Sequence, residues 1–133
     1  MSEENLKIVR AAFEAFQRDG VEGIMPFLDE QIEWRNPEDS PIAGVWRGHD
    51  GVRDWFKQAS EAFGDMTFTP EEFREVSEDR ILVLLRFGLT GTESGIQMEV
   101  PFAHVIDMKA GRATALRMYS DQLKALEAAG LAE

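Results

Sequence analysis

The C-terminal third of the chain limits its fold more than any other segment. Residues Val100 to Leu131 read VPFAHVIDMKAGRATALRMYSDQLKALEAAGL, with two β-patterned runs around the turn Lys109-Ala110-Gly111. Such runs on either side of a glycine-bearing turn are typical of a β-hairpin. The second run ends at Tyr119-Ser120-Asp121, and the Ala/Leu-rich segment after it predicts a short helix that uses Leu123 and Leu126.

Amphipathic helices are predicted before the strands. One stripe of apolar residues recurs at spacings of three and four: Leu6, Val9, Phe13 and Phe16. It predicts a helix from near Ser2 to Asp19-Gly20, and a short second helix over Val21 to Leu28 is limited in regularity by Pro26. A third helix is predicted from Gly48, with Asp50 as its candidate cap.

The rest of the chain is strand-like. The predicted strands are Gln31 to Arg35, Met66 to Glu75, Arg80 to Thr90, Ile96 to Met108 and Arg112 to Ser120. A loop is expected over Asn36 to Arg47, where Pro37, Pro41 and Gly44 break any period. Helices first and strands afterwards predict one α+β domain over residues 1–133, in which a strongly curved, mostly antiparallel sheet wraps the N-terminal helices around a pocket.

Composition excludes several classes of function. The chain has no cysteine and only two histidines, so we expect no metal site. Its 25 acidic and 14 basic residues give a net charge of −11, which repels the phosphate backbone of nucleic acids. The start MSEENLK lacks the pattern of a signal peptide, and the longest apolar run, Ile81 to Leu85, is too short to span a bilayer. We therefore expect a cytoplasmic protein with no nucleic-acid or membrane partner.

Two segments resemble a known family. The C-terminal hairpin and helix, together with the stretch WRNPEDSPIAGVWRGHDGVRDWF from Trp34 to Phe56, resemble the SnoaL-like branch of the nuclear transport factor 2-like superfamily. Ketosteroid isomerase, limonene epoxide hydrolase and polyketide cyclases belong to that superfamily. The resemblance implies a cone-shaped α+β barrel, a pocket for an apolar small molecule, no cofactor and a homodimer.

At the positions that correspond to the catalytic residues of ketosteroid isomerase-like enzymes, this chain has other residues. Asn36 stands where these enzymes have the aspartate base before a proline. They stabilise the enolate with a tyrosine and a neutral aspartic acid. Phe13 stands at the position of that tyrosine, and the aspartic acid falls on Ala103 if the stretch from Pro101 to His104 is in the right register. An amide is no general base and a phenyl ring has no donor, so this reaction by the usual route is not expected.

The catalytic residues of the other two groups of enzymes are also mostly replaced in this chain. The aspartate, arginine and aspartate of limonene epoxide hydrolase-like members fall on Ile81, Val83 and Met118. Polyketide cyclase-like members carry a histidine that His104 can match, but their aspartate falls again on Met118, and Asp121 comes too late. We expect Asp121 to cap the last helix.

Three residues are candidates for catalysis. His104 would serve as a general acid or base if it faces the pocket, and as a satisfied or outward-facing imidazole if it does not; the register leaves open whether Ala103 or His104 points inward. Asn36 would bind a carbonyl or a water, or cap the turn at Pro37. Asp39 would be a replacement base at the mouth, or a solvated loop acid.

Large apolar residues are expected to bind the substrate. They are Phe13, Trp34, Trp55, Phe56, Val83, Phe87, Phe102 and Met118. Two functions fit this set. The first is a pocket for an apolar, ring-containing molecule, with cofactor-independent isomerisation, cyclisation or hydrolysis by proton transfer if it is catalytic. The second is a non-catalytic ligand-binding or dimeric interaction module, since the relatives' acids and bases are replaced.

Overall fold

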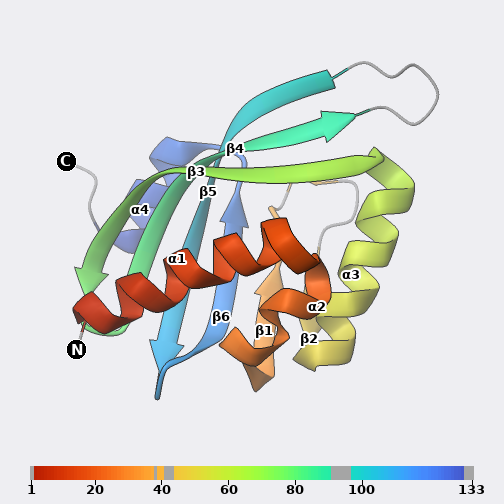
Figure 1. Ribbon diagram of the computed structural model, residues 1–133. Coiled ribbons are helices and arrows are strands. Elements are labelled where there is room, and N and C mark those ends of the chain that lie inside the picture. The colour runs from red at the N-terminus through yellow and green to blue at the C-terminus, as the bar shows by residue number, and fades with distance from the viewer. Residues whose placement is uncertain (1, 38, 41–43, 91–96, 131–133) are drawn as a thin grey trace.

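The structure is a computed structural model that describes residues 2–37, 39–40, 44–90 and 97–130. Within these residues, four α-helices and a six-stranded sheet give the predicted α+β architecture (Figure 1). The helices are α1 (Ser2–Asp19), α2 (Val21–Ile24), the 3-10 helix η1 (Met25–Phe27), α3 (Gly48–Phe63) and α4 (Gln122–Ala129). The strands are β1 (Leu28–Arg35), β2 (Val45–Arg47), β3 (Asp65–Ser77), β4 (Arg80–Thr90), β5 (Gln97–Lys109) and β6 (Arg112–Tyr119).

The sheet is mixed and open. Its strands follow the order β2-β1-β6-β5-β4-β3, and every neighbouring pair is antiparallel except β1 and β6, which run parallel. The predicted mostly antiparallel sheet is therefore confirmed, although β2 and β3 do not pair, so the cone is not a closed barrel. Strand β2 lies in the segment predicted as a loop, and Ile96, where one strand was predicted to begin, lies outside the described residues.

Irregular pairing accompanies the curvature of the sheet. The register shifts between Pro70 and Glu72 and again between Glu75 and Ser77 along β3 and β4. Another shift lies between Asp107 and Met108 on β5, where it pairs with β6. Such irregularities bend a strand and increase its twist. The sheet forms a concave surface, and α1 lies across it (Figure 1).

Side-chain alternation on β5 separates two apolar layers. Phe102, Ile106 and Met108 belong to the main core under α1 and α3. Ala103 and Val105 point to the opposite face, where Ala125 and Ala129 of α4 cover them. Since successive strand residues point to opposite faces, this register places His104 on the concave side. The sequence left that choice open.

The helix ends agree only in part with the predictions. Helix α1 has the predicted bounds, whereas the predicted second helix divides into α2 and η1. Asp50 was predicted to cap α3, but Arg47 occupies the cap position without a side-chain hydrogen bond. Asp50 lies in the first turn instead, where its carboxylate accepts a hydrogen bond from Arg53 at 2.9 Å.

The apolar face of α4 also differs from its prediction. Small residues, Ala125 and Ala129, are buried against the sheet, and Leu126 is half-buried beside them. Leu123 is 60% exposed and does not serve as the predicted anchor. Alanines allow the helix backbone to come close to the strands, so the larger side chain is left at the edge.

None of the helices in the described part of the chain is long and apolar enough to cross a membrane.

Asp121 caps α4, as predicted. One carboxylate oxygen, Oδ1, accepts hydrogen bonds from the backbone N–H of Leu123 at 2.9 Å and of Lys124 at 3.4 Å. Asp121→Ala should lower the free energy of unfolding by about 1 kcal/mol because two helix N–H groups lose their acceptor. Urea unfolding measures the loss. Asp121→Asn is the control and should keep most of the stability, since its amide oxygen can cap; equal losses in both variants would contradict the capping role.

Candidate functional site

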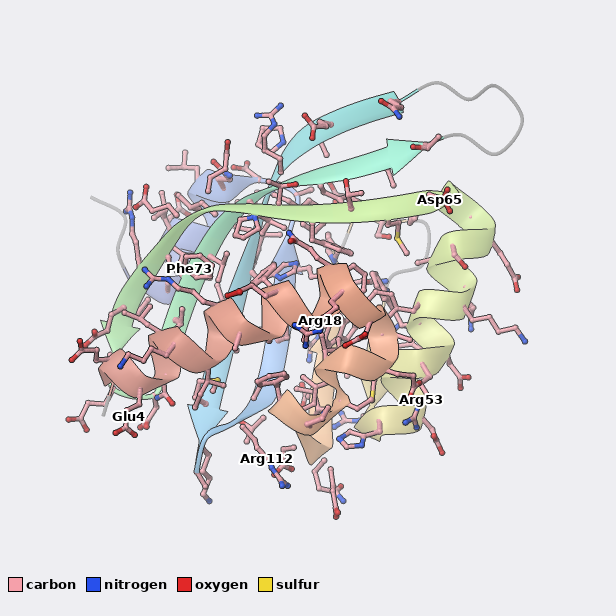
Figure 2. All side chains as sticks on the ribbon, viewed as in Figure 1. Glu4, Arg18, Arg53, Asp65, Phe73 and Arg112 are labelled. Atoms are coloured by element: carbon pink, nitrogen blue, oxygen red, sulfur yellow. The ribbon has the colours of Figure 1, made fainter. Side chains whose placement is uncertain are left out.

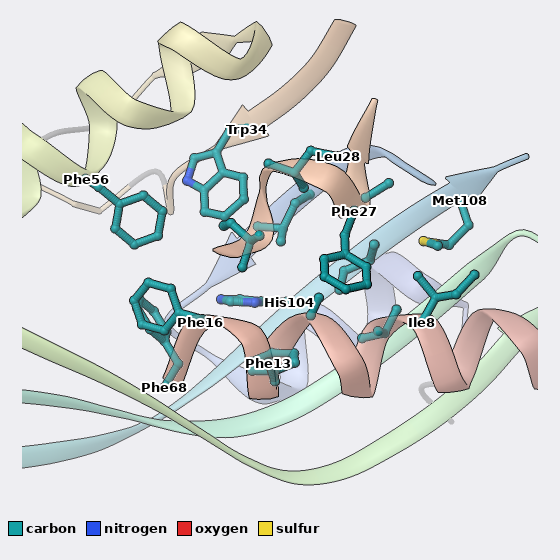
Figure 3. A pocket seen from close by; sticks show the side chains of 16 residues that line it. Ile8, Phe13, Phe16, Phe27, Leu28, Trp34, Phe56, Phe68, His104 and Met108 are labelled. Atoms are coloured by element: carbon teal, nitrogen blue, oxygen red, sulfur yellow. The ribbon is translucent and has the colours of Figure 1, made fainter. Parts of the chain in front are cut away.

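A cavity of about 70 Å³ lies between α1, the α2–η1 segment and the concave face of the sheet (Figure 3). Its lining consists of Ile8, Val9, Ala12, Phe13, Phe16, Ile24, Phe27, Leu28, Trp34, Phe56, Phe68, His104, Ile106, Met108, Ala113 and Leu116. Fifteen of these sixteen side chains are apolar or aromatic, and the sixteenth is His104. The cavity is therefore a suitable place for an apolar molecule.

Packed aromatic rings form the wall at one end of this cavity. The ring centroid of Phe16 lies 5.3 Å from that of Phe56 and 5.3 Å from that of Phe68. Trp34 completes the wall, with its centroid 5.7 Å from that of Phe56. These rings come from α1, β1, α3 and β3, so distant segments of the chain have to pack together to build the wall.

His104 is the ionisable residue among the described residues that line the cavity. It lies on β5 between Val83 of β4 and Met118 of β6, and its residue is 4% exposed. Both ring nitrogens are buried and have no hydrogen-bond partner among the described residues. Its ring faces aromatic neighbours instead, with centroids 6.0 Å from Phe13 and 6.0 Å from Phe68.

Burial determines the charge of His104. It lowers the pKa of the imidazole from 6.5 to about 3, because the charged form would lose its hydration without gaining a partner. The ring is therefore neutral at pH 7 and offers one N–H donor and one acceptor nitrogen. The indole Nε1 of Trp34 is a second buried donor without a partner in the described part of the chain.

Among the described residues, no charged side chain lines the cavity. Their lining set contains no aspartate, glutamate, lysine or arginine, so none of them supplies a counter-ion for a charged ligand group inside the cavity. Among the described residues, no group of three or more histidine, aspartate or glutamate side chains is placed to hold a metal ion. The arrangement can enclose an apolar body and form hydrogen bonds with one uncharged polar group.

Several of the predicted binding residues line the cavity and others do not. Phe13, Trp34, Phe56 and the candidate catalytic residue His104 line it. Five predicted residues are buried in the core outside the lining: Trp55, Val83, Phe87, Phe102 and Met118. Trp55, for example, packs behind the wall, 5.7 Å from Trp34 and 4.8 Å from Phe56 between ring centroids. These five residues pack in the core around the lining side chains and do not line the cavity themselves.

The other two candidate catalytic residues lie away from the cavity. Asn36 is buried just after the end of β1, and its backbone N–H donates to the carbonyl of Gly44 at 3.2 Å. Asp39 is exposed, and its carboxylate accepts a hydrogen bond from the hydroxyl of Ser120 at 2.7 Å. Asp39 therefore joins the loop to the end of β6, and neither residue is among those lining the cavity.

The sequence interpretation missed many of the lining residues. They are Ile8, Val9, Ala12, Phe16, Ile24, Phe27, Leu28, Phe68, Ile106, Met108, Ala113 and Leu116. A signal for the first helix was present, because Phe16 belongs to the recognised stripe, and Ile8 and Ala12 precede it at spacings of four. No such signal exists for Phe27 or Leu28, whose positions depend on how η1 enters the sheet.

The buried imidazole makes stability depend on pH. Below pH 6.5 the unfolded chain takes up a proton at His104, whereas the folded chain does so only near pH 3. The contribution of this residue to the free energy of unfolding should therefore fall by about 1.4 kcal/mol per pH unit as the pH decreases between these values. In His104→Leu this loss should be absent. Urea unfolding of both proteins measures it, and parallel pH curves would contradict the buried neutral ring.

Comparisons with known proteins give the following similarities. A nuclear transport factor 2-like protein of unknown function from Burkholderia pseudomallei is 28% identical, with a TM-score of 0.79 over 93% of this chain and 95% of that one. TerC, co-crystallised with polyporic acid, is 25% identical, with a TM-score of 0.80 over 96% and 98% of the two chains. A Catenulispora acidiphila protein with a ketosteroid isomerase-like fold is 14% identical, with a TM-score of 0.72 over 93% and 92%, which shows the fold alone.

The sequence was also compared with curated proteins and with protein-family models. None of the curated proteins compared with the chain is significantly similar to it. A family model described as the SnoaL-like domain matches residues 9–116, which include most of α1 and reach into β6.

Proposed function

The chain belongs to the SnoaL-like domain family, and from this premise we propose that it binds a small, mostly apolar molecule in the cavity, where His104 forms the hydrogen bond. One observation carries the proposal. An almost wholly apolar cavity contains a neutral imidazole with both nitrogens buried and without a partner among the described residues. A ligand with a hydroxyl or carbonyl group would supply the missing hydrogen bond while its apolar part fills the space.

Size and charge restrict the ligand further. Cavities for drug-sized molecules measure roughly 300–1,000 Å³. The present cavity of about 70 Å³ admits only a smaller group unless side chains move. The aromatic wall around Phe16 and Phe56 favours a ring or a compact alkyl group by ring packing. An ionised group inside would lack a counter-ion, so the portion of the ligand within the cavity is uncharged.

TerC supports a ligand of this kind. It has the same fold, is 25% identical, and was co-crystallised with the organic molecule polyporic acid. For the present chain this similarity supports small-molecule binding as the function. The size and polarity proposed for the ligand are inferred from the cavity and not from TerC.

Filling the cavity tests the proposal. Cyclohexanol is a suitable probe because it combines an apolar ring with one hydroxyl. Ala12→Phe places a large side chain into the cavity from α1 and should abolish saturable binding measured by calorimetry. Ala62→Phe adds the same side chain at an exposed position of α3 and should leave binding unchanged. Absence of binding to the unmodified protein, or equal binding to both variants, would contradict the proposal.

The role of His104 can be separated from that of the cavity. His104→Leu replaces the imidazole with an apolar side chain of similar size and removes the hydrogen-bonding nitrogens. Affinity for cyclohexanol should fall roughly fivefold, since one hydrogen bond contributes about 1 kcal/mol. Unchanged affinity in His104→Leu would show that the ligand does not contact the imidazole.

Proton-transfer catalysis is the second candidate function. The observation that favours it is the position of His104, which borders the space that a substrate would occupy. Burial keeps its pKa near 3, so the free protein holds a weak base, and a substrate would have to raise that pKa on binding. The lining residues in the described part of the chain include no carboxylate as its partner. A new product detected by mass spectrometry, and lost in His104→Ala, would favour catalysis over binding alone.

The predicted homodimer and the cytoplasmic location stay predictions. Met98 on β5 is 54% exposed and Leu123 on α4 is 60% exposed, and such apolar side chains are suited to a contact between copies. Light scattering at micromolar concentration should give twice the 15.0 kDa mass of one chain. A mass of one chain at every concentration would contradict the dimer.

A further inference from the structure

A polar groove adjoins the apolar cavity. It has a volume of about 420 Å³ and lies between the start of α1, the turn between β3 and β4, and the turn between β5 and β6. Its lining consists of Glu4, Asn5, Ile8, Glu78, Asp79, Met108, Lys109, Ala110 and Gly111. Two of these residues, Ile8 and Met108, also line the cavity, so the two hollows meet at these side chains.

The shared side chains lie at one end of the cavity. Figure 3 shows Ile8 and Met108 together at the end opposite Phe56 and Trp34. From Ile8 to Phe16 the helix α1 covers roughly 12 Å at 1.5 Å per residue, so the cavity is elongated along this helix. Ile8 is half-buried, and methionine has a flexible side chain. Both side chains border the cavity and the groove, so a ligand that occupies both hollows has to displace Ile8 and Met108.

Backbone hydrogen bonds hold the groove in shape. The side-chain amide of Asn5 donates to the carbonyl of Glu78 at 2.7 Å, which fixes α1 on the turn between β3 and β4. The backbone N–H of Met108 donates to the carbonyl of Asp79 at 2.7 Å, which fixes β5 on the same turn. Because these bonds use the backbone of Glu78 and Asp79, both carboxylates stay available at the surface.

The groove carries an excess of negative charge. Its side chains include three carboxylates, on Glu4, Glu78 and Asp79, and one ammonium group, on Lys109, which leaves −2 at pH 7. The whole chain has a charge of −11 and adds to the negative potential at this place. A positively charged group is therefore attracted to the groove, whereas an anion is repelled.

We propose that the natural ligand is a cationic amphiphile, with its apolar part in the cavity beside His104 and its ammonium head in the groove between Glu4, Glu78 and Asp79. This inference rests on the proposed function, because the apolar part occupies the same cavity. It explains how a cavity of about 70 Å³ serves a larger molecule, since the groove accommodates the remainder. It also places the charge where carboxylates and water surround it rather than among apolar side chains.

Probes that share one chain and differ in the head group test the inference. Hexyltrimethylammonium, hexanol and hexyl sulfate are titrated into the full chain by calorimetry. The cation should bind tighter than hexanol, and the sulfate should bind weakest. The double variant Glu4→Gln/Glu78→Gln should weaken binding of the cation roughly fivefold and leave hexanol unchanged, because two surface carboxylates contribute only modestly. Added salt should reduce the preference for the cation.

A matched control separates the groove from the net charge. Glu61→Gln/Asp65→Asn removes the same number of charges at the opposite end of the molecule, where Figure 2 shows Asp65 far from Glu4. This control should bind the cation as the unmodified protein does. Equal weakening in both double variants, or a cation that binds no tighter than hexanol, would overturn the inference and leave the proposed function intact. Failure of every hexyl probe to bind would contradict both.

Discussion

The site depends on how α1 is held above a sheet that curves away from it. On the β3 side, Phe13 meets Phe73 edge to face with centroids 5.9 Å apart, and the guanidinium carbon of Arg10 lies 5.1 Å from the centre of the same ring. On the other side, α1 rests on α2 and η1. With both flanks supported, the middle of the helix cannot descend onto β5 and β6, so a space remains between Ala12 and Leu116 that close packing would otherwise remove.

The same geometry links the inner site to the outer face. Ala103 and Val105 of β5 are covered by Ala125 and Ala129 of α4 on the convex side, which sets the register of β5 relative to the helix. A shift by one residue would turn Ala103 inward and place His104 against the alanines of α4. The small helix α4 thus contributes to the position of the imidazole, although it lies on the opposite face of the sheet and does not touch the cavity.

Local pattern predicts most of the fold and part of the site. The bounds of α1, β4 and β6 follow from hydrophobic period and turn residues, which act over a few neighbours. The short strand β2 and the parallel pairing of β1 with β6 join distant segments and have no local signal. For the site, alternation identifies the inner face but not the depth of a side chain, so Phe87 and Met118 were expected at the cavity although they lie in the core beyond it. The helical spacing likewise placed Phe16 on the apolar stripe of α1 without showing that its ring lines the cavity.

His104 is costly to keep where it lies. A buried polar group without a hydrogen-bond partner destabilises the folded state by about 1–3 kcal/mol relative to one that is satisfied, and an apolar residue would avoid this cost. Features that lower stability tend to occur at functional sites, where a bound molecule can compensate for them. A ligand that hydrogen-bonds to the imidazole would recover part of that energy in addition to what its apolar surface contributes. A ligand whose buried part carries a hydroxyl or carbonyl group should therefore bind in the cavity more tightly than a pure hydrocarbon, because the imidazole has no hydrogen-bond partner among the described residues.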